Sequence, residues 1–190
     1  MHTAEPAPSR EPVTIRDAET ADLASITAIY NHAVEHTTAI WNEALVDVHE
    51  RAGWLTQRRA EGFPVIVAVD GSDDLLGYAS YGPWRAFSGF RRTVENSVYV
   101  RDGEHGRGIG TALMTALISR AREAGLHVIV AAIESGNTGS IALHERLGFT
   151  ETGRLPQVGE KFGRWLDLSL LQLVLDDSPA PGPAPGAPSA

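Results

Sequence analysis

The stretch V-Y-V-R-D-G-E-H-G-R-G-I-G-T, residues 98–111, decides how the rest of the chain can be arranged. It starts with β-branched and aromatic residues that favour a strand, passes through a glycine-rich turn, and ends where a helical pattern begins. Glycines let backbone N–H groups approach a ligand closely, and the amino end of a helix carries partial positive charge. The stretch therefore predicts a strand–turn–helix unit that can hold phosphate groups, to which Arg107 adds a cation. A tight glycine turn that binds nothing is the alternative.

Two common nucleotide-binding motifs do not fit this stretch. A P-loop requires a lysine directly before its Ser or Thr, and no lysine precedes Thr111. A dinucleotide fingerprint requires G-x-G-x-x-G, and Gly108 and Gly110 are followed by Ala112 and Met114 without a third glycine at that spacing. A phosphate-binding turn of another class is therefore expected.

The hydrophobic pattern on either side predicts the remaining elements. Four helices are expected. The first begins after Thr20, which would cap it, and the second covers residues 47–62 with an Asp47/Glu50 capping box. The other two cover residues 110–124 and 139–147. Strands are expected over residues 13–16, 65–69, 75–81, 94–100, 128–133, 149–158 and 162–174. The order β-α-α-β-β-β-α-β-α-β-β indicates a mixed α/β domain.

Composition excludes several classes of protein. The 190 residues suit one domain, with 43% hydrophobic and 21% charged residues. The absence of cysteine excludes disulfides, thiolate metal sites and a cysteine nucleophile. A net charge of −8 argues against nucleic-acid binding. No apolar run reaches the ~18 residues of a membrane span and no secretory signal is visible, so we expect a cytoplasmic protein without membrane contact.

The two ends of the chain differ from its middle. Residues 178–190 read S-P-A-P-G-P-A-P-G-A-P-S-A, a proline-, alanine- and glycine-rich composition with almost nothing to bury. Residues 1–12 are similar. We expect a disordered leader over residues 1–12, a folded domain over 13–177 and a disordered tail over 178–190.

The glycine turn resembles a known family. R-G-I-G at 107–110, after V-Y-V, is similar to the pyrophosphate loop of the GNAT acetyltransferases, as is Asn137 before the helix that ends L-H-E-R-L-G-F at 143–149. Residues 83–100 and 156–168 resemble the phosphinothricin and methionine sulfoximine/sulfone N-acetyltransferases, the second segment more closely the methionine sulfoximine/sulfone branch. The resemblance covers residues 14–175. His105 departs from the Gln or Arg that the family usually has there, and a neutral histidine offers less charge to a pyrophosphate.

This resemblance implies a GNAT fold, with a mixed central sheet and flanking helices, and a specific activity. Acetyl-CoA would be the co-substrate, no metal would be needed, and the α-amino group of a small L-amino acid or analogue would be acetylated by direct transfer, as in detoxification. The family also implies a homodimer, and the basic and aromatic segment at 161–165 suits an interface. The residues expected to bind acetyl-CoA are Val98, Tyr99, Val100, Gly106, Arg107, Gly108, Ile109, Gly110, Thr111 and Ser140.

Two residues are candidates for proton transfer. Strand alternation places Glu95 on the face opposite Val94 and Val98, so Glu95 need not belong to the core. A carboxylate can take the proton of an α-ammonium directly or through one water. A solvated strand glutamate is the alternative, and the resemblance of T-V-E-N-S-V-Y-V favours the base. By the same resemblance His144 occupies the position of the family's tyrosine acid, where it would protonate the thiolate or orient the site. A packing role is the alternative.

The acceptor amino acid would be held by neighbouring residues. The guanidinium of Arg85 matches a carboxylate, with a free surface arginine as the alternative. Ser88, Gly89 and Phe90 would shape the side-chain pocket, and Asn137 would bind substrate or cofactor unless it only caps a helix. Other readings are a GNAT enzyme that acetylates peptide N-termini or aminoglycosides, and a CoA-binding sensor without catalysis.

Overall fold

Strands and helices follow the predicted order in the computed structural model, which describes residues 12–176. The strands are β1 (Thr14–Asp17), β2 (Val65–Val69), β3 (Leu75–Pro83), β4 (Thr93–Val100), β5 (Val128–Glu134), β6 (Thr150–Lys161) and β7 (Arg164–Val174). The helices are α1 (Leu23–His36), α2 (Val48–Ala60), α3 (Ile109–Glu123) and α4 (Thr138–Arg146), with short 3-10 turns η1 (Thr20–Asp22) and η2 (Ser88–Phe90). The predicted α/β class is confirmed. The predicted leader, apart from Pro12, and the predicted tail lie outside the described residues.

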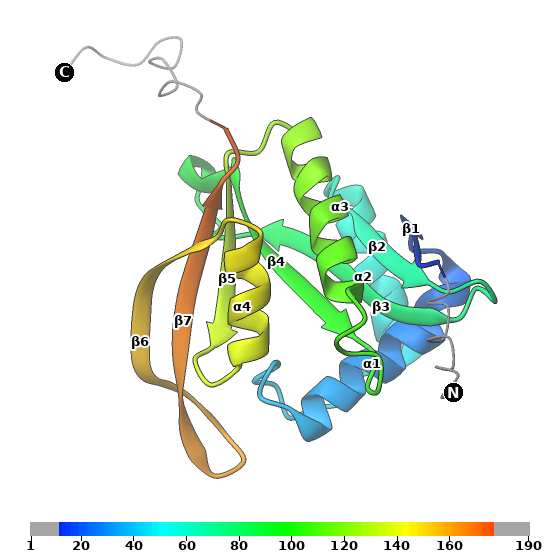
Figure 1. Ribbon diagram of the computed structural model, residues 1–190, viewed down its shortest axis with the longest axis horizontal. Helices are drawn as coiled ribbons and strands as arrows, with labels where there is room; N and C mark the ends of the chain where they lie inside the picture. Colours follow the sequence, from blue (N-terminus) through cyan, green and yellow to red (C-terminus); the bar gives the residue numbers. More distant parts are fainter. Residues whose placement is uncertain (1–11, 177–190) are drawn as a thin grey trace, which may run out of the picture.

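The strands form one mixed sheet in the order β1-β2-β3-β4-β5-β7-β6. Every neighbouring pair is antiparallel except β4 and β5, which run parallel. Their register has only three pairs, from Thr93 opposite Val128 to Glu95 opposite Val130. Beyond Glu95 the two strands diverge, as Figure 1 shows, while each keeps its antiparallel partner on the other side. The middle of the sheet therefore opens into a wedge.

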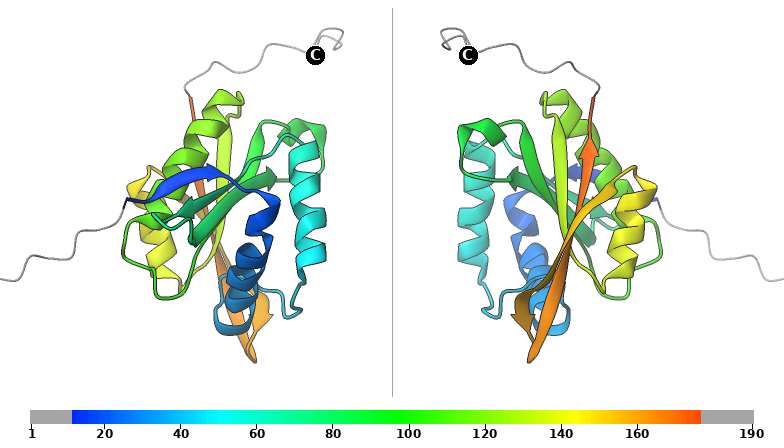
Figure 2. Two further views of the ribbon diagram at one scale, coloured as in Figure 1. Left: turned by 90° about the vertical axis from the view of Figure 1, so that its right-hand side faces the viewer. Right: turned by 90° about the vertical axis from the view of Figure 1, so that its left-hand side faces the viewer.

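Helices cover both faces of this sheet. Figure 2 shows α1 and α2 on one side and α3 and α4 on the other. Strand alternation divides the core accordingly: Ile66 and Ala68 of β2 join the cluster with α3, whereas Val65, Val67 and Val69 join the cluster with α1 and α2. Burying one such aliphatic side chain contributes roughly 1.5–3 kcal/mol. The sheet is thus covered by a separate core on each face.

Most helix ends follow the predicted signals, and one does not. Asp47 caps α2, since its carboxylate accepts the N–H of Glu50 at 2.8 Å. Thr20 does not cap the first helix. A 3-10 turn already begins there, because the N–H of Glu19 donates to the Asp22 carboxylate at 2.6 Å and Arg16 holds the same carboxylate at 2.7 Å.

The last two strands form a hairpin with a short turn. Phe162, predicted as the start of the last strand, lies in this turn. Phe162 and Gly163 both have positive φ, 52° and 68°, and Lys161 pairs with Arg164. Two such residues form the type I′ turn that suits the twist of a hairpin. The hairpin extends to the carboxyl end of α1, next to the wedge (Figure 1).

Candidate active site

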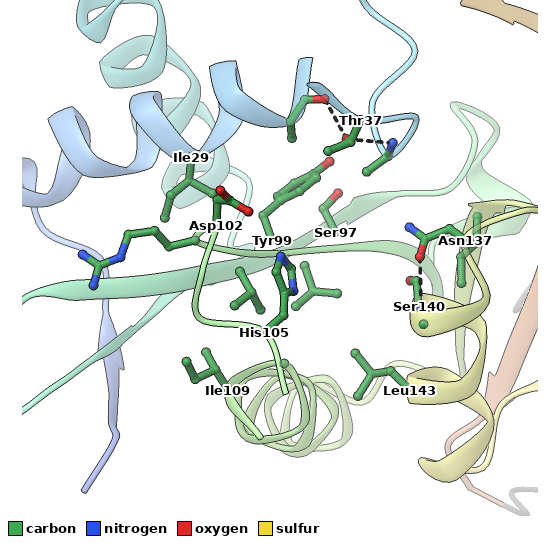
Figure 3. A pocket seen from close by; sticks show the side chains of 18 of the residues that line it. Ile29, Thr37, Ser97, Tyr99, Asp102, His105, Ile109, Asn137, Ser140 and Leu143 are labelled. Atoms are coloured by element: carbon green, nitrogen blue, oxygen red, sulfur yellow. Dashed lines mark hydrogen bonds between the residues drawn. The ribbon is translucent and has the colours of Figure 1, made fainter. Parts of the chain in front are cut away.

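An open cleft of about 1460 Å³ fills the wedge between β4 and β5. Its walls are the diverging strands, the amino ends of α3 and α4, and the carboxyl end of α1 (Figure 3). The predicted cofactor residues that line it are Val98, Tyr99, Val100, Gly106, Gly108, Ile109, Gly110, Thr111 and Ser140. The structure thus gathers nearly all of the residues expected to bind acetyl-CoA into one place.

The glycine turn gives the cleft its anion-binding end. Gly106 and Gly108 have φ of 78° and 82°, the left-handed conformation that other residues rarely adopt, and Gly108 is the cap of α3. The first amides of α3 therefore face the cleft without a helical carbonyl partner. Peptide N–H groups and the positive end of the helix suit a pyrophosphate, so the residues present fit acetyl-CoA.

Arg107 is the exception among the predicted cofactor residues. It does not line the cleft, and its guanidinium is paired with the carboxylate of Glu104. Arg107, and next to it Arg101 at 3.2 Å, hold the pKa of Glu104 below its usual range. His105 does line the cleft, as do the arginines at positions 101, 146 and 164. In this structure the positive charge nearest the turn is therefore shared with an acidic residue.

Glu95 lies at the point where the two strands separate. It is half-buried, lines the cleft and forms the last parallel pair with Val130. Burial raises the pKa of its carboxyl group, while the charges of Arg85 and Arg58 oppose the shift. A carboxylate with a raised pKa is a stronger base, and the two arginines keep it available in ionised form.

Ser97 and Tyr99 lie on the same face of β4 as Glu95. Figure 3 shows their side chains pointing toward α1. Burial raises the pKa of Tyr99 to about 12, so the phenol is a neutral donor at physiological pH. This face of β4 is consequently polar where the opposite face packs into the core with Val94.

His144 lies on the other side of the sheet and is buried. Its Nδ1 lies 2.8 Å from the carbonyl oxygen of Ser140, and its Nε2 lies 3.0 Å from the amide nitrogen of Asn96. Because the carbonyl can only accept, Nδ1 carries the proton and Nε2 accepts from Asn96. Burial lowers the pKa of His144, which keeps the ring neutral. Both ring nitrogens are therefore engaged.

Two residues at the amino end of α4 complete this wall. The side-chain oxygen of Asn137 accepts the N–H of Ser140 at 3.1 Å, and both residues line the cleft (Figure 3). Nearby, the carboxylate of Glu134 accepts the hydroxyl of Thr38 at 3.0 Å and the N–H of Gly136 at 2.9 Å. Asn137 thus caps a helix and retains its place on the cleft.

Arg85 and the residues of η2, which were predicted to hold the acceptor, are not among those that line the cleft. Arg85 is exposed, stacks on Trp84 at 3.9 Å from the ring centroid and donates to the Trp84 carbonyl at 3.1 Å. Its charge nevertheless reaches Glu95. Ser88, Gly89 and Phe90 form η2, are exposed, and do not line the cleft.

Lys161 is a buried residue whose position the sequence did not indicate. Its Nζ donates to the carbonyls of Val34, Thr37 and Ile40 at 2.5, 2.8 and 2.6 Å. It thereby caps the carboxyl end of α1, although the sequence suggested an intermolecular role for this segment. The exposed aromatic members of that segment are Phe162 and Trp165. A lysine in a strand gives no local signal for a partner more than a hundred residues away.

Arg51 and Arg58 of α2 are the other side chains that were missed. Both line a small pocket on the Glu95 side of the sheet, together with Ser97 and Tyr99. Their spacing of seven residues places them on one helix face, next to the buried Leu55. Helical periodicity could have placed them toward the sheet, but it could not have indicated what they meet there.

Comparison with known proteins agrees with this geometry. The family model described as the acetyltransferase (GNAT) family matches residues 26–149. A protein of Pseudomonas aeruginosa named L-methionine sulfoximine/L-methionine sulfone acetyltransferase is 61% identical over 163 residues, which cover 86% of this chain and 95% of that protein.

Solved structures show the same fold. A Salmonella typhimurium protein solved with its cofactor acetyl-CoA superposes with a TM-score of 0.87 at 54% identity, covering 90% of this chain and 98% of that one. A phosphinothricin acetyltransferase of the GNAT superfamily from Sinorhizobium meliloti, solved with acetyl-CoA, gives a TM-score of 0.86 at 36% identity and covers 92% of this chain and 94% of that one.

Proposed function

The chain belongs to the acetyltransferase (GNAT) family and is an acetyl-CoA-dependent N-acetyltransferase, and from this premise we propose that it acetylates the α-amino group of a small L-amino acid. The proposed substrates are methionine sulfone, methionine sulfoximine, phosphinothricin or a close analogue, the compounds for which its relatives are named. The observation that carries the proposal is the position of Glu95, a half-buried carboxylate where β4 and β5 separate.

The proposed role of Glu95 is to remove a proton from the substrate ammonium. An α-ammonium has a pKa near ~8, so most of it is protonated at neutral pH and cannot attack a thioester. The carboxylate takes the proton directly or through one water, and the amine then attacks the carbonyl carbon. The C–N bond forms, the C–S bond breaks, and the thiolate of CoA leaves and takes up the second proton that the amine nitrogen loses. Backbone N–H groups of residues 98–100 stabilise the oxygen on which charge develops.

The proposed cofactor contacts are the lining residues of the cleft. The amides of the turn at 106–111 bind the pyrophosphate, residues 98–100 bind the pantetheine arm, and Ser140 closes the other side. Arg107 also binds the pyrophosphate if its guanidinium leaves the carboxylate of Glu104 for a phosphate oxygen. His144 is proposed to orient Asn96 and the start of α4 rather than to donate a proton, because its ring is neutral and its Nε2 accepts a hydrogen bond.

The proposed acceptor contacts lie beyond Glu95. Arg85 binds the α-carboxylate, for which it must leave the carbonyl of Trp84, and Ser88, Gly89 and Phe90 of η2 close over the side chain. Asn137, which lines the cleft, is proposed to donate a hydrogen bond to substrate or cofactor. We further propose a cytoplasmic homodimer that detoxifies such amino acids.

A CoA-release assay tests this function. Purified protein is supplied with acetyl-CoA and, in turn, methionine sulfone, phosphinothricin, a peptide with a free N-terminus, and an aminoglycoside. We expect release with the amino acids and a rise in melting temperature with acetyl-CoA alone, since a ligand of the native state stabilises it. Binding of acetyl-CoA without release would indicate a sensor, and release only with the peptide or aminoglycoside would indicate the other GNAT activities. EDTA should not reduce the rate.

A further inference from the structure

A second, smaller pocket adjoins the cleft on the α2 side of the sheet. Its volume is about 80 Å³. Ser97 and Tyr99 line both the cleft and this pocket, so the two spaces meet at β4 directly beyond Glu95. The remaining lining residues are Tyr30, Arg51, Trp54, Arg58, Ser80, Tyr78 and Tyr81. The walls are thus aromatic, with two guanidinium groups and two hydroxyl-bearing serines.

The Nε of each guanidinium group lacks an acceptor among the described residues. Arg51 is only 9% exposed, its Nε has no hydrogen-bond partner among the described residues, and its Nη2 lies 3.4 Å from Glu50. The Nε of Arg58 is also buried without a partner there, and its nearest carboxylate, on Glu61, is 4.0 Å away. A buried donor without an acceptor costs free energy, and more when it is charged. Oxygen atoms of a ligand would satisfy both groups.

Stacking holds Arg51 in this position. Its guanidinium carbon lies 4.4 Å from the centre of the Tyr30 ring and 5.1 Å from that of Trp54. Such contacts orient the plane of the guanidinium but supply no acceptor for its N–H groups. The arrangement is preorganised for a ligand oxygen.

Arg58 lies within reach of a substrate bound at Glu95. Its guanidinium covers the α-carbon of Gly82, where any Cβ would overlap it. Gly82 is the cross-strand partner of Glu95, and the α-carbons of such partners lie about 4.5–5.5 Å apart. An amino acid whose ammonium contacts Glu95 can therefore extend its side chain to Arg58.

We propose that the pocket between Arg51 and Arg58 binds the oxygen-bearing end of the acceptor's side chain, a sulfone, sulfoximine or phosphinate group. This rests on the proposed function, which places the ammonium at Glu95 and the α-carboxylate at Arg85. Each of these groups is a tetrahedral sulfur or phosphorus with polar substituents and a methyl group. The guanidinium groups match the oxygens and the aromatic walls match the methyl. A water occupies about 30 Å³ of liquid, so the pocket holds a group of a few heavy atoms.

Substrate preference tests the proposal. For methionine sulfone and for methionine, which has the same carbon chain without the oxygens, kcat/KM is measured with the unaltered enzyme and with Arg58→Leu. The unaltered enzyme should prefer the sulfone, and Arg58→Leu should reduce that preference roughly ten- to a hundredfold, the effect of losing a charged hydrogen bond. Arg59→Leu is the matched control. Its side chain donates to the carbonyl of Ala18, outside the pocket, so it should leave the preference unchanged.

A second variant covers the case in which Arg58→Leu does not fold. Gly82→Ala keeps Arg58 but displaces its guanidinium, and it should reduce the preference in the same direction. The proposal is overturned if the unaltered enzyme has no preference, or if Arg58→Leu slows both substrates equally, which would make Arg58 structural. It is also overturned if Arg58→Leu mainly reduces discrimination between an amino acid and the amine without its carboxylate. Failure of the proposed function itself would look different: no amino acid would be acetylated by the unaltered enzyme.

Discussion

Glu95 experiences burial and two positive charges at once, and its expected pH behaviour follows from their balance. Burial is the larger effect and raises the pKa, so protonation occurs above the range of an exposed carboxyl group. As pH falls through this raised pKa the base is lost, and kcat/KM should fall with it. A plot of kcat/KM against pH for the unaltered enzyme should therefore show an acidic limb assignable to Glu95.

Glu95→Gln tests that assignment, because glutamine retains the shape but cannot accept a proton. The substitution should reduce kcat/KM about 10²–10⁴-fold at neutral pH. The variant should lose the acidic limb assigned to Glu95. It should recover activity as the pH approaches the pKa of the substrate ammonium, near ~8, because free amine is then abundant. Its binding of acetyl-CoA should be unchanged. A variant with near-normal activity at neutral pH would show that Glu95 is a bystander.

Replacing Arg85 should impair acetylation of an amino acid more than acetylation of an amine without a carboxylate. Arg85→Ala removes the proposed partner of the α-carboxylate and should raise KM for the amino acid roughly ten- to a hundredfold, the effect of a lost charged hydrogen bond. An amine that lacks the carboxylate serves as the comparison, and its acetylation should hardly change. Steady-state kinetics with the two acceptors measure this difference, and equal losses for both would make Arg85 structural.

At the scale of elements, α1 depends on a residue from the other end of the fold. Lys161→Met keeps the aliphatic stem but leaves the carbonyls of Val34, Thr37 and Ile40 without their donor. Each buried acceptor left unsatisfied costs about 1–3 kcal/mol, partly offset because a buried charge is removed. The melting temperature should fall by several degrees, at about 2–4 °C per kcal/mol. Glu160→Met, at the exposed neighbouring position, is the control in thermal unfolding. Equal melting temperatures for the two variants would refute this role.

The elements themselves were largely predictable from the sequence. Local pattern placed every strand and helix within a few residues, because periodicity and capping residues such as Asp47 act over short distances. The predicted start of the first helix was wrong because the ion pair between Arg16 and Asp22 gives no local signal in the sequence. The divergence of β4 and β5 has no local signal, since no residue pattern encodes where a parallel pair ends.

The parts of the site that are formed by backbone groups were predictable from the sequence, and the parts that depend on side-chain contacts were less so. The cofactor residues were predicted from the glycine turn together with the family resemblance. The pairing of Arg107 with Glu104 and the position of Arg58 over Gly82 depend on rotamers and on cross-strand neighbours. Such contacts arise only once the fold is assembled.

At the scale of the whole molecule, the β6–β7 hairpin carries several exposed apolar side chains. They include Leu155, Val158, Phe162 and Trp165, and Trp165 is 64% exposed. Exposed aromatic and aliphatic side chains suit an interface between subunits. We predict a dimer by light scattering at micromolar concentration, and a shift to monomer in Trp165→Glu. Val174→Glu, at an exposed position farther along β7, is the control and should stay dimeric. A monomeric unaltered protein would contradict the prediction.

The short parallel register between β4 and β5 has a consequence for amide hydrogen exchange. On one edge β4 is bonded to β3 from Val94 to Val100, but on the other edge its pairing with β5 ends at Glu95. Peptide N–H groups of residues 96–100 that point toward β5 thus lack a strand partner and should take up deuterium quickly, although they lie in the middle of a seven-stranded sheet. Acetyl-CoA that bonds to this edge should slow the uptake there and leave β2 and β3 unchanged. The pantetheine arm would then complete the sheet as a missing strand does.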